Sequence, residues 1–348
     1  MELTKKKYNG LDIGKFLCAF LILFYHYFSE HRGLPTIIEE ALSLYAVAVA
    51  LFMLISGFLT FNKIQSLESR EERWGVVKRQ ALRIFKIYLL WSVIYIIYSI
   101  SRWDFQNITL SFVLWQLQGW IFNSTFYTIW FMPALAIGLI VAFWLTEKLP
   151  AWLCTMLGII LYVIGSMMLT YSSVGNMLPG FQIFKRFALT WLGGARGWLF
   201  FATPLLMLGK FAVKVKDKIK VISAFILSVV SVGAILVEAL ILRKFVGHTG
   251  IDMTVMMVPS VFFILLFLLN INIPDGAYSV WMRKMSVLIF MTQRIFLTVI
   301  PSLLGAGICS KLFANTYIGA IAICGGTALF SALIIAFSKK FKVLKNLY

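Results

Sequence analysis

Residues 221–241 read VISAFILSVVSVGAILVEALI, an apolar run in which Glu238 is the one charged side chain. A helix needs roughly 20 apolar residues to cross the hydrocarbon core of a bilayer, so this run predicts a transmembrane helix. Similar runs recur from one end of the chain to the other. We expect ten spans, at about 11–29, 41–61, 84–101, 126–146, 151–171, 198–213, 221–241, 253–271, 285–304 and 316–337. The sequence therefore predicts an all-α, polytopic membrane helix bundle.

The composition of the whole chain agrees with this fold class. Its 348 residues are 61% hydrophobic and 13% charged, whereas a soluble domain is about 45–50% apolar and about 25% charged. Aromatic residues make up 16% of the chain, as expected of a bilayer protein with many interfacial anchors. No soluble domain fits between the spans, so we expect a single integral-membrane domain over 1–348. This composition excludes a soluble enzyme, a disordered scaffold and a secreted disulfide domain.

Basic residues are distributed unevenly between the two predicted faces of the membrane. Ten spans place both termini on one side, and 23 of the 32 Lys and Arg residues fall on that side, against 8 on the other. Cytoplasmic loops collect Lys and Arg, so both termini are predicted to be cytoplasmic, in a multi-pass protein of the plasma membrane. The same rule explains the net charge of +18. Because no basic soluble domain is available, we expect no nucleic acid as a partner.

The cysteines give no sign of a metal site or a disulfide. Cys18, Cys154, Cys309 and Cys324 form neither a CxxC pair nor a cluster with ligand spacing. We therefore expect no metal and no disulfide.

Two ionisable residues in the first predicted span are candidates for function, because ionisable groups are costly inside a bilayer. Lys15 and His26 are eleven residues apart, which is only about 20° more than three full helical turns. They therefore share one face of the helix, about 16 Å apart along its axis. Glu30 follows His26 by four residues and could orient the imidazole. The alternatives are a lysine that snorkels to the interface and a histidine at the wet boundary.

A second candidate is the basic cluster at the inner end of the third span. Arg79, Arg83 and Lys86 are spaced i, i+4 and i+7, which places them on one stripe of a helix. Such a stripe suits phosphate oxygens, which arginine can bind with two parallel hydrogen bonds. The alternatives are simple positive-inside anchoring and contact with anionic lipid.

The two long segments on the predicted outer side, 102–125 and 172–197, are long enough to fold over an outer cavity. The stretch 191–198 reads WLGGARGW, and it could present Arg196 at the edge of that cavity. The alternative is a solvated loop cation.

Five stretches, in order along the chain, resemble motifs of the membrane acyltransferase family 3, bacterial proteins that O-acylate cell-surface sugars. They are 11–26 (LDIGKFLCAFLILFYH), 51–59 (LFMLISGFL), 78–84 (KRQALRI), 128–135 (TIWFMPAL) and 195–204 (ARGWLFFATP). The last stretch is also similar to the membrane modules fused to vancomycin-type serine racemases. The resemblance covers essentially the whole chain.

The resemblance implies an O-acyltransferase, most simply an O-acetyltransferase, that uses cytoplasmic acyl-CoA such as acetyl-CoA as donor and an outer sugar or glycan as acceptor. Lys15, Arg79, Arg83 and Lys86 would then hold the CoA phosphates. His26 would be the general base, oriented by Glu30. Trp130 and Arg196 would contact the acceptor.

The sequence departs from the family pattern at three places. Lys15 and Gln80 stand where the family usually has arginine, and Gln293 stands where it commonly has histidine. A lysine keeps the charge but loses the guanidinium fork.

Two other functions stay open. One is a transporter-like module for a small solute such as an amino acid, although we find no internal repeat of the kind common in transporters. The other is a non-catalytic partner of a polysaccharide synthesis system. The sequence does not predict the oligomeric state.

Overall fold

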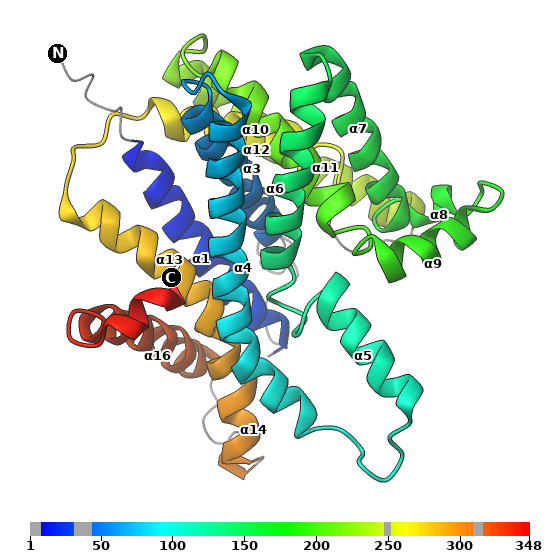
Figure 1. The fold of residues 1–348 in the computed structure, drawn as a ribbon, viewed down its shortest axis with the longest axis vertical. Helices are drawn as coiled ribbons and strands as arrows, with labels where there is room; N and C mark the ends of the chain where they lie inside the picture. Colours follow the sequence, from blue (N-terminus) through cyan, green and yellow to red (C-terminus); the bar gives the residue numbers. More distant parts are fainter. Residues whose placement is uncertain (1–7, 31–43, 247–251, 306, 309–315) are drawn as a thin grey trace. The chain divides into compact units, whose positions relative to one another are not determined.

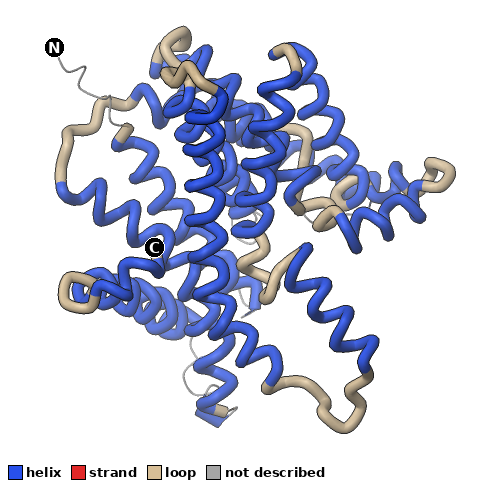
Figure 2. The backbone as a smooth tube through the Cα atoms, viewed as in Figure 1, coloured by secondary structure: helices blue, strands red, loops and turns tan. Residues whose placement is uncertain are grey.

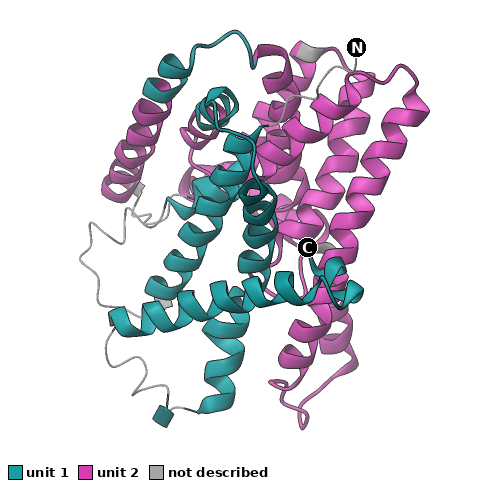
Figure 3. Cartoon of the chain, turned by 90° about the vertical axis from the view of Figure 1, so that its left-hand side faces the viewer, with its two compact units in different colours: residues 1–51, 216–226, 263–348 teal, residues 52–215, 227–262 magenta. Residues whose placement is uncertain are grey.

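The computed structural model describes residues 8–30, 44–246, 252–305, 307–308 and 316–348. Every regular element in these residues is a helix, and the described chain contains no strand (Figures 1 and 2). Two compact units can be distinguished (Figure 3). Unit 1 comprises residues 1–51, 216–226 and 263–348, and unit 2 comprises 52–215 and 227–262. The all-α prediction is confirmed, whereas a single domain over 1–348 stays a prediction.

The bounds of the elements are as follows. The longer helices are α1 (Asn9–Glu30), α3 (Tyr45–Ile64), α4 (Arg70–Ile100), α5 (Leu110–Phe122), α6 (Phe131–Lys148), α7 (Ala151–Met168), α9 (Phe181–Trp191), α10 (Thr203–Val215), α11 (Val221–Val246), α12 (Met257–Asn270), α13 (Ala277–Arg294) and α16 (Thr316–Phe337). The shorter elements are α8 (Ser172–Gly175), α14 (Ile300–Leu304), the π-helical turns η1 (Trp198–Ala202) and η2 (Ile295–Val299), and the 3₁₀ turn η3 (Lys342–Leu347).

Each of the ten predicted spans coincides with a helix. Eight helical segments of the described chain are long and apolar enough to cross a membrane. The predicted spans at 151–171 and 253–271 correspond to shorter apolar helices, Trp152–Met168 and Met257–Asn270. The membrane helix bundle is thus confirmed, while the count of ten spans and the cytoplasmic termini stay predictions.

The third predicted span is longer than the sequence indicated. Its helix, α4, begins at Arg70 and not near residue 84. The hydroxyl of Ser69 accepts the backbone N–H of Glu72 at 3.0 Å and so caps the helix. Glu71 and Glu72 in the first turn stabilise this end through the helix dipole. Hydropathy missed this extension because its residues are charged, and the basic stripe therefore lies on a regular helix.

The two long segments that were predicted to lie on the outer side are also more regular than expected. Segment 102–125 contains α5, and segment 172–197 contains α8 and α9. Helix α5 is apolar, but its 13 residues are too few to span a bilayer. Helices α5 and α9 contact each other within unit 2. Packed helices therefore take the place of the loops that the sequence suggested.

In unit 1, α1 packs beside α13 and α16. Helices α1 and α13 pack together and run in the same direction, as shown by contacts between polar side chains at their N-terminal ends. The Asn9 side-chain amide donates to the Asp275 carboxylate at 2.7 Å, and the Ser279 hydroxyl donates to Asp12 at 2.8 Å. The ten-span topology requires this parallel arrangement, since the first and ninth spans cross the membrane in the same sense.

In unit 2, α6 packs against α4 and α10, and α10 also packs against α7. Helices α3 and α10 approach closely at two glycines. A Cβ atom on Gly57 would lie 2.6 Å from the Leu206 carbonyl oxygen, and one on Gly209 would lie 2.5 Å from the Phe58 nitrogen. Small residues at helix crossings are typical of membrane bundles, where backbones pack directly on each other.

Candidate functional site

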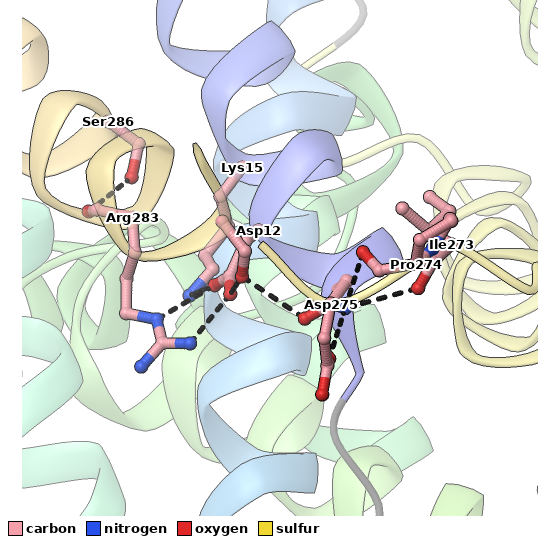
Figure 4. Close-up of polar contacts among 9 residues, drawn as sticks. Asp12, Lys15, Ile273, Pro274, Asp275, Arg283 and Ser286 are labelled. Carbon is pink, nitrogen blue, oxygen red and sulfur yellow. Dashed lines mark hydrogen bonds and ion pairs between the residues drawn. The ribbon is translucent and has the colours of Figure 1, made fainter. Parts of the chain in front are cut away.

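The N-terminal end of α1 carries a buried carboxylate that is shared by two cations (Figure 4). Asp12 is 4% exposed. Arg283 of α13 donates to both of its oxygens, from Nε at 3.0 Å and from Nη2 at 2.7 Å. Such a charge-assisted, two-point contact fixes geometry as well as energy. The structure therefore anchors α1 to α13 through Asp12.

Lys15, predicted to contact CoA phosphates, belongs to the same group. Its Nζ lies 3.4 Å from an Asp12 oxygen, one turn earlier on α1. Two cations and one carboxylate leave the group with a net positive charge. Sequence reasoning missed Asp12 and Arg283, although the i, i+3 spacing of Asp12 and Lys15 was a readable signal.

His26 lies near the other end of α1, half-buried among aromatic rings. The centroid of its imidazole is 5.8 Å from the Tyr45 ring of α3, and Tyr25 stacks on Tyr45 at 3.6 Å. Helix α1 is continuous from Asn9 to Glu30, so Lys15 and His26 keep the predicted spacing. Glu30 ends the helix, but its side chain lies outside the described residues, so its contact with His26 stays a prediction.

The predicted donor stripe lies on α4 with exposed side chains at Arg79, Arg83 and Lys86. Arg73, on the same helix, contrasts with them. Its Nη2 donates to Glu147 of α6 at 2.8 Å, and its Nη1 donates to the carbonyls of Leu67 and Glu68. Arg73 therefore holds α4 against α6, while the stripe faces outward.

Trp130 and Arg196, the two predicted acceptor residues, come together in unit 2. The Arg196 guanidinium lies 5.7 Å over the centroid of the Trp130 ring, a cation–π contact. One of its nitrogens is 3.5 Å from the Asp252 carboxylate. Both residues line a cavity of about 690 Å³. A volume of 300–1,000 Å³ is typical of small-molecule sites.

The cavity is formed by the end of α4, by α5 and the segment after it, and by the glycine-rich turn before η1. Its lining includes aromatic residues from several elements and two arginines. These residues are Tyr98, Arg102, Trp103, Trp120, Phe126, Tyr127, Trp130, Arg196 and Trp198. Arg102 was absent from the candidates predicted from sequence.

Asp252 belongs to a turn that α7 and α11 hold in place. The Tyr162 hydroxyl donates to the Thr254 carbonyl at 2.8 Å. The Glu238 carboxylate accepts the backbone N–H groups of Val255 and Met256, at 2.7 and 2.9 Å. Tyr171 also donates to Glu238. Glu238, an ionisable residue within a predicted span, thus fixes the turn that carries the partner of Arg196.

The predicted residues fall into both units. Lys15, His26 and Glu30 belong to unit 1. The α4 stripe, Trp130 and Arg196 belong to unit 2. In the part of the chain that the structure describes, no group of three His, Cys, Asp or Glu side chains is placed to hold a metal ion.

Comparison with curated proteins gives distant relatives. The chain is 24% identical to an amino-acid racemase of Enterococcus faecalis, over 98% of this chain and 48% of that protein. A second amino-acid racemase of the same organism is 22% identical, over 99% and 47%. A serine/alanine racemase of Enterococcus gallinarum is 26% identical, over 69% and 34%. The chain thus spans about half the length of the two E. faecalis relatives. No solved structure matches the chain.

The family comparison is more decisive. The model of the family described as an acyltransferase domain matches residues 8–337, a range that extends from the start of α1 to the end of α16. Since the match runs through nearly the whole helical bundle, this chain belongs to that family of membrane acyltransferases.

Proposed function

We propose that the protein transfers an acyl group, most simply acetyl, from cytoplasmic acyl-CoA to a hydroxyl of a cell-surface or exported glycan. The observation that carries the proposal is His26, placed at the opposite end of α1 from Lys15 in a chain of the acyltransferase family. A base near one membrane face and cations near the other suit a reaction whose two substrates approach from opposite sides.

In the proposed reaction, the neutral imidazole of His26 takes the proton of the acceptor hydroxyl as its oxygen attacks the thioester carbonyl. A C–O bond forms and the C–S bond breaks. The proton then passes to the departing thiolate, so the products are the O-acyl glycan and free CoA. Glu30 would hold the second ring nitrogen and favour the orientation needed for proton transfer.

The donor is proposed to bind through its phosphates. Arg79 and Arg83 present guanidinium groups on the exposed face of α4, and Lys86 extends that face by one turn. Lys15 adds charge, but its ion pair with Asp12 makes it the weaker contributor. Trp130 and Arg196 would contact the acceptor in the aromatic cavity.

The test uses membrane vesicles from cells that overproduce the protein, because such vesicles contain the native acceptor. Labelled acetyl-CoA is added, and both CoA release and label in glycan are measured. His26→Ala should lower transfer by about 10²–10⁴-fold, the usual contribution of a positioned acid–base group. Leu17→Ala, an exposed site on the same helix away from His26, is the matched control and should keep the activity. Near-normal transfer by His26→Ala would remove His26 from the mechanism.

The racemase relatives favour a second candidate function. The chain matches about half of each E. faecalis racemase, so it could serve as a membrane module that handles an amino acid. This alternative predicts uptake of labelled L-serine by the vesicles without acyl-CoA. A non-catalytic partner in polysaccharide synthesis predicts neither uptake nor transfer by the purified protein.

A further inference from the structure

We infer that the aromatic cavity of unit 2 binds an anionic substituent, a carboxylate or a phosphate, on the sugar that accepts the acyl group. The inference rests on the proposed function, because it names the class of acceptor. It adds Arg102 to the site and gives Asp252 a role in selectivity.

The first argument is the chemistry of the cavity wall. Arg102 and Arg196 both line the cavity, and no Asp, Glu or Lys is among the lining residues that the structure describes. Two cations without a carboxylate in the same wall favour a negatively charged ligand. Guanidinium groups bind carboxylate and phosphate oxygens through two parallel hydrogen bonds.

The second argument is the position of each guanidinium. Arg102 lies 5.7 Å over the Tyr98 ring, and Arg196 lies at the same distance over Trp130. An arginine that lies over an aromatic face is oriented by the ring, and its N–H groups lie at the edge of the guanidinium plane. Aromatic walls also provide flat apolar surfaces for the ring of a sugar. The cavity therefore combines surfaces for a pyranose with donors for its acidic group.

The third argument concerns Asp252. Its carboxylate is 3.5 Å from Arg196, at the upper end of ion-pair distances, and the Arg196 side chain is 42% exposed. An incoming anion would compete with Asp252 for the same guanidinium. Tyr162 and Glu238 hold the backbone of the turn just after Asp252, at Thr254, Val255 and Met256, which keeps Asp252 close to Arg196. Asp252 thus weakens the hold of Arg196 on any anion, and only a ligand that also reaches Arg102 binds well.

The same wall disfavours a free amino acid. A zwitterion needs an acceptor for its ammonium group as well as donors for its carboxylate, and Asp252, the carboxylate beside the cavity, is already paired with Arg196. An acidic sugar has no such requirement.

The experiment measures binding and not transfer, so its result does not depend on the donor. The purified protein in lipid nanodiscs is titrated with methyl β-D-glucuronide, glucose 6-phosphate, methyl β-D-glucoside and L-serine, and binding is followed by saturation-transfer difference NMR. The glucuronide and the phosphate distinguish the two sources of negative charge. At least one of them should bind about tenfold more tightly than the neutral glucoside, and L-serine should bind no better than the glucoside.

Three variants test the residues. Arg102→Gln and Arg196→Gln should each weaken binding of the anionic sugar about three- to tenfold and leave the neutral glucoside unchanged, because only charge-assisted hydrogen bonds are lost. Asp252→Asn should have the opposite effect and tighten anion binding about two- to fivefold. A purely structural role for Asp252 predicts no such gain. Arg186→Gln, an exposed arginine of α9 that does not line the cavity, is the matched control and should change nothing.

The outcomes separate this inference from the proposed function. Equal binding of the charged and neutral sugars, or unchanged anion binding in both arginine variants, overturns the anionic site while acyl transfer to a neutral glycan could still occur. Preferential binding of L-serine also overturns it and favours the transport alternative. Tight anion binding with no acyl transfer from acetyl-CoA in vesicles upholds the site and rejects the proposed function.

Discussion

The two ends of α4 differ in what surrounds their cations. The first half of the helix carries closely spaced Lys and Arg residues, with Arg79, Arg83 and Lys86 exposed along one stripe. Just beyond the other end, Arg102 lies over the Tyr98 ring, and both residues line the cavity. The helix has 31 residues, which corresponds to about 46 Å and is longer than the hydrocarbon core of a bilayer.

We propose that this difference serves two kinds of ligand. A row of cations one turn apart creates a high local positive charge but no shaped pocket. Such a surface suits the several phosphates of a flexible nucleotide. A cavity lined by aromatic rings and few charged groups provides a shaped surface with little charge. Such a surface suits a sugar ring. One helix would thus contribute to donor binding at one face of the membrane and to acceptor binding at the other.

The contrast between the two ends of α4 depends first on whether they lie on opposite sides of the membrane, and a test of this topology should give an all-or-none result. Single cysteines at Ser66 and Asn107, both at exposed positions, should react from opposite sides with a membrane-impermeant thiol reagent. Ser66 should be cytoplasmic and Asn107 outside, because the basic residues gather on the side of Ser66. The four native cysteines are replaced by serine beforehand. Labelling of both positions from the outside would reject the span assignment and the comparison with it.

Among the substitutions that test ligand binding, Arg83→Ala should produce the largest change in affinity. Removal of one charge-assisted phosphate contact costs about 1.5–3 kcal/mol, so acyl-CoA affinity should fall roughly 10–150-fold. Arg83→Lys should restore only part of the affinity, since the guanidinium fork is lost. Equilibrium binding of labelled acetyl-CoA in nanodiscs measures both. Lys63→Ala, an exposed cation of α3 on the same predicted side, is the control. If Arg83→Ala binds the donor as well as the wild type does, the stripe is an anchor and the comparison fails.

Arg73→Ala should show that a cation on α4 that joins two helices differs in its effect from a cation that binds the donor. Arg73 and Glu147 join α4 to α6 through a contact of 2.8 Å, with side chains 26% and 15% exposed. Its removal should lower stability by about 1–2 kcal/mol, which is visible as a lower melting temperature in detergent. Donor affinity should change less than twofold. A large loss of donor affinity with unchanged melting temperature would assign Arg73 to the donor site.

Trp130→Ala should have the smallest effect, confined to ligand binding in the cavity near the C-terminal end of α4. The ring contacts Arg196 and lines the cavity, so its removal should weaken acceptor binding by about 1 kcal/mol, roughly fivefold. Acetyl-CoA affinity should stay the same. Parallel titrations with methyl β-D-glucuronide and acetyl-CoA test this selectivity, and an equal loss for both ligands would argue for a general distortion.

The sequence predicted the parts of the fold that hydrophobicity controls. All ten apolar runs correspond to helices, because a run of membrane length has no other stable structure in a bilayer. The first turns of α4 were not predicted, because Arg70, Glu71 and Glu72 are charged and a hydropathy pattern excludes them. Ser69 and Glu72 did carry a readable capping signal.

Contacts between segments far apart in the chain could not be predicted from the sequence. The pairing of Arg196 with Asp252, and of Asp12 with Arg283, depends on which helices are neighbours, and periodicity within one helix does not contain that information. Arg196 was named from the glycine-rich stretch 191–198 and Trp130 from a family resemblance, and the structure brings the two side chains together. The roles of His26, Glu30 and the α4 stripe stay predictions.

The central claim is transfer from a donor on one side of the membrane to an acceptor on the other. Labelled acetyl-CoA, which does not cross membranes, is added to inverted and to right-side-out vesicles of overproducing cells. The account predicts labelled glycan in the inverted vesicles, almost none in the right-side-out vesicles, and none in either with His26→Ala. Label that depends on neither orientation nor His26, or uptake of L-serine in place of glycan labelling, would contradict it.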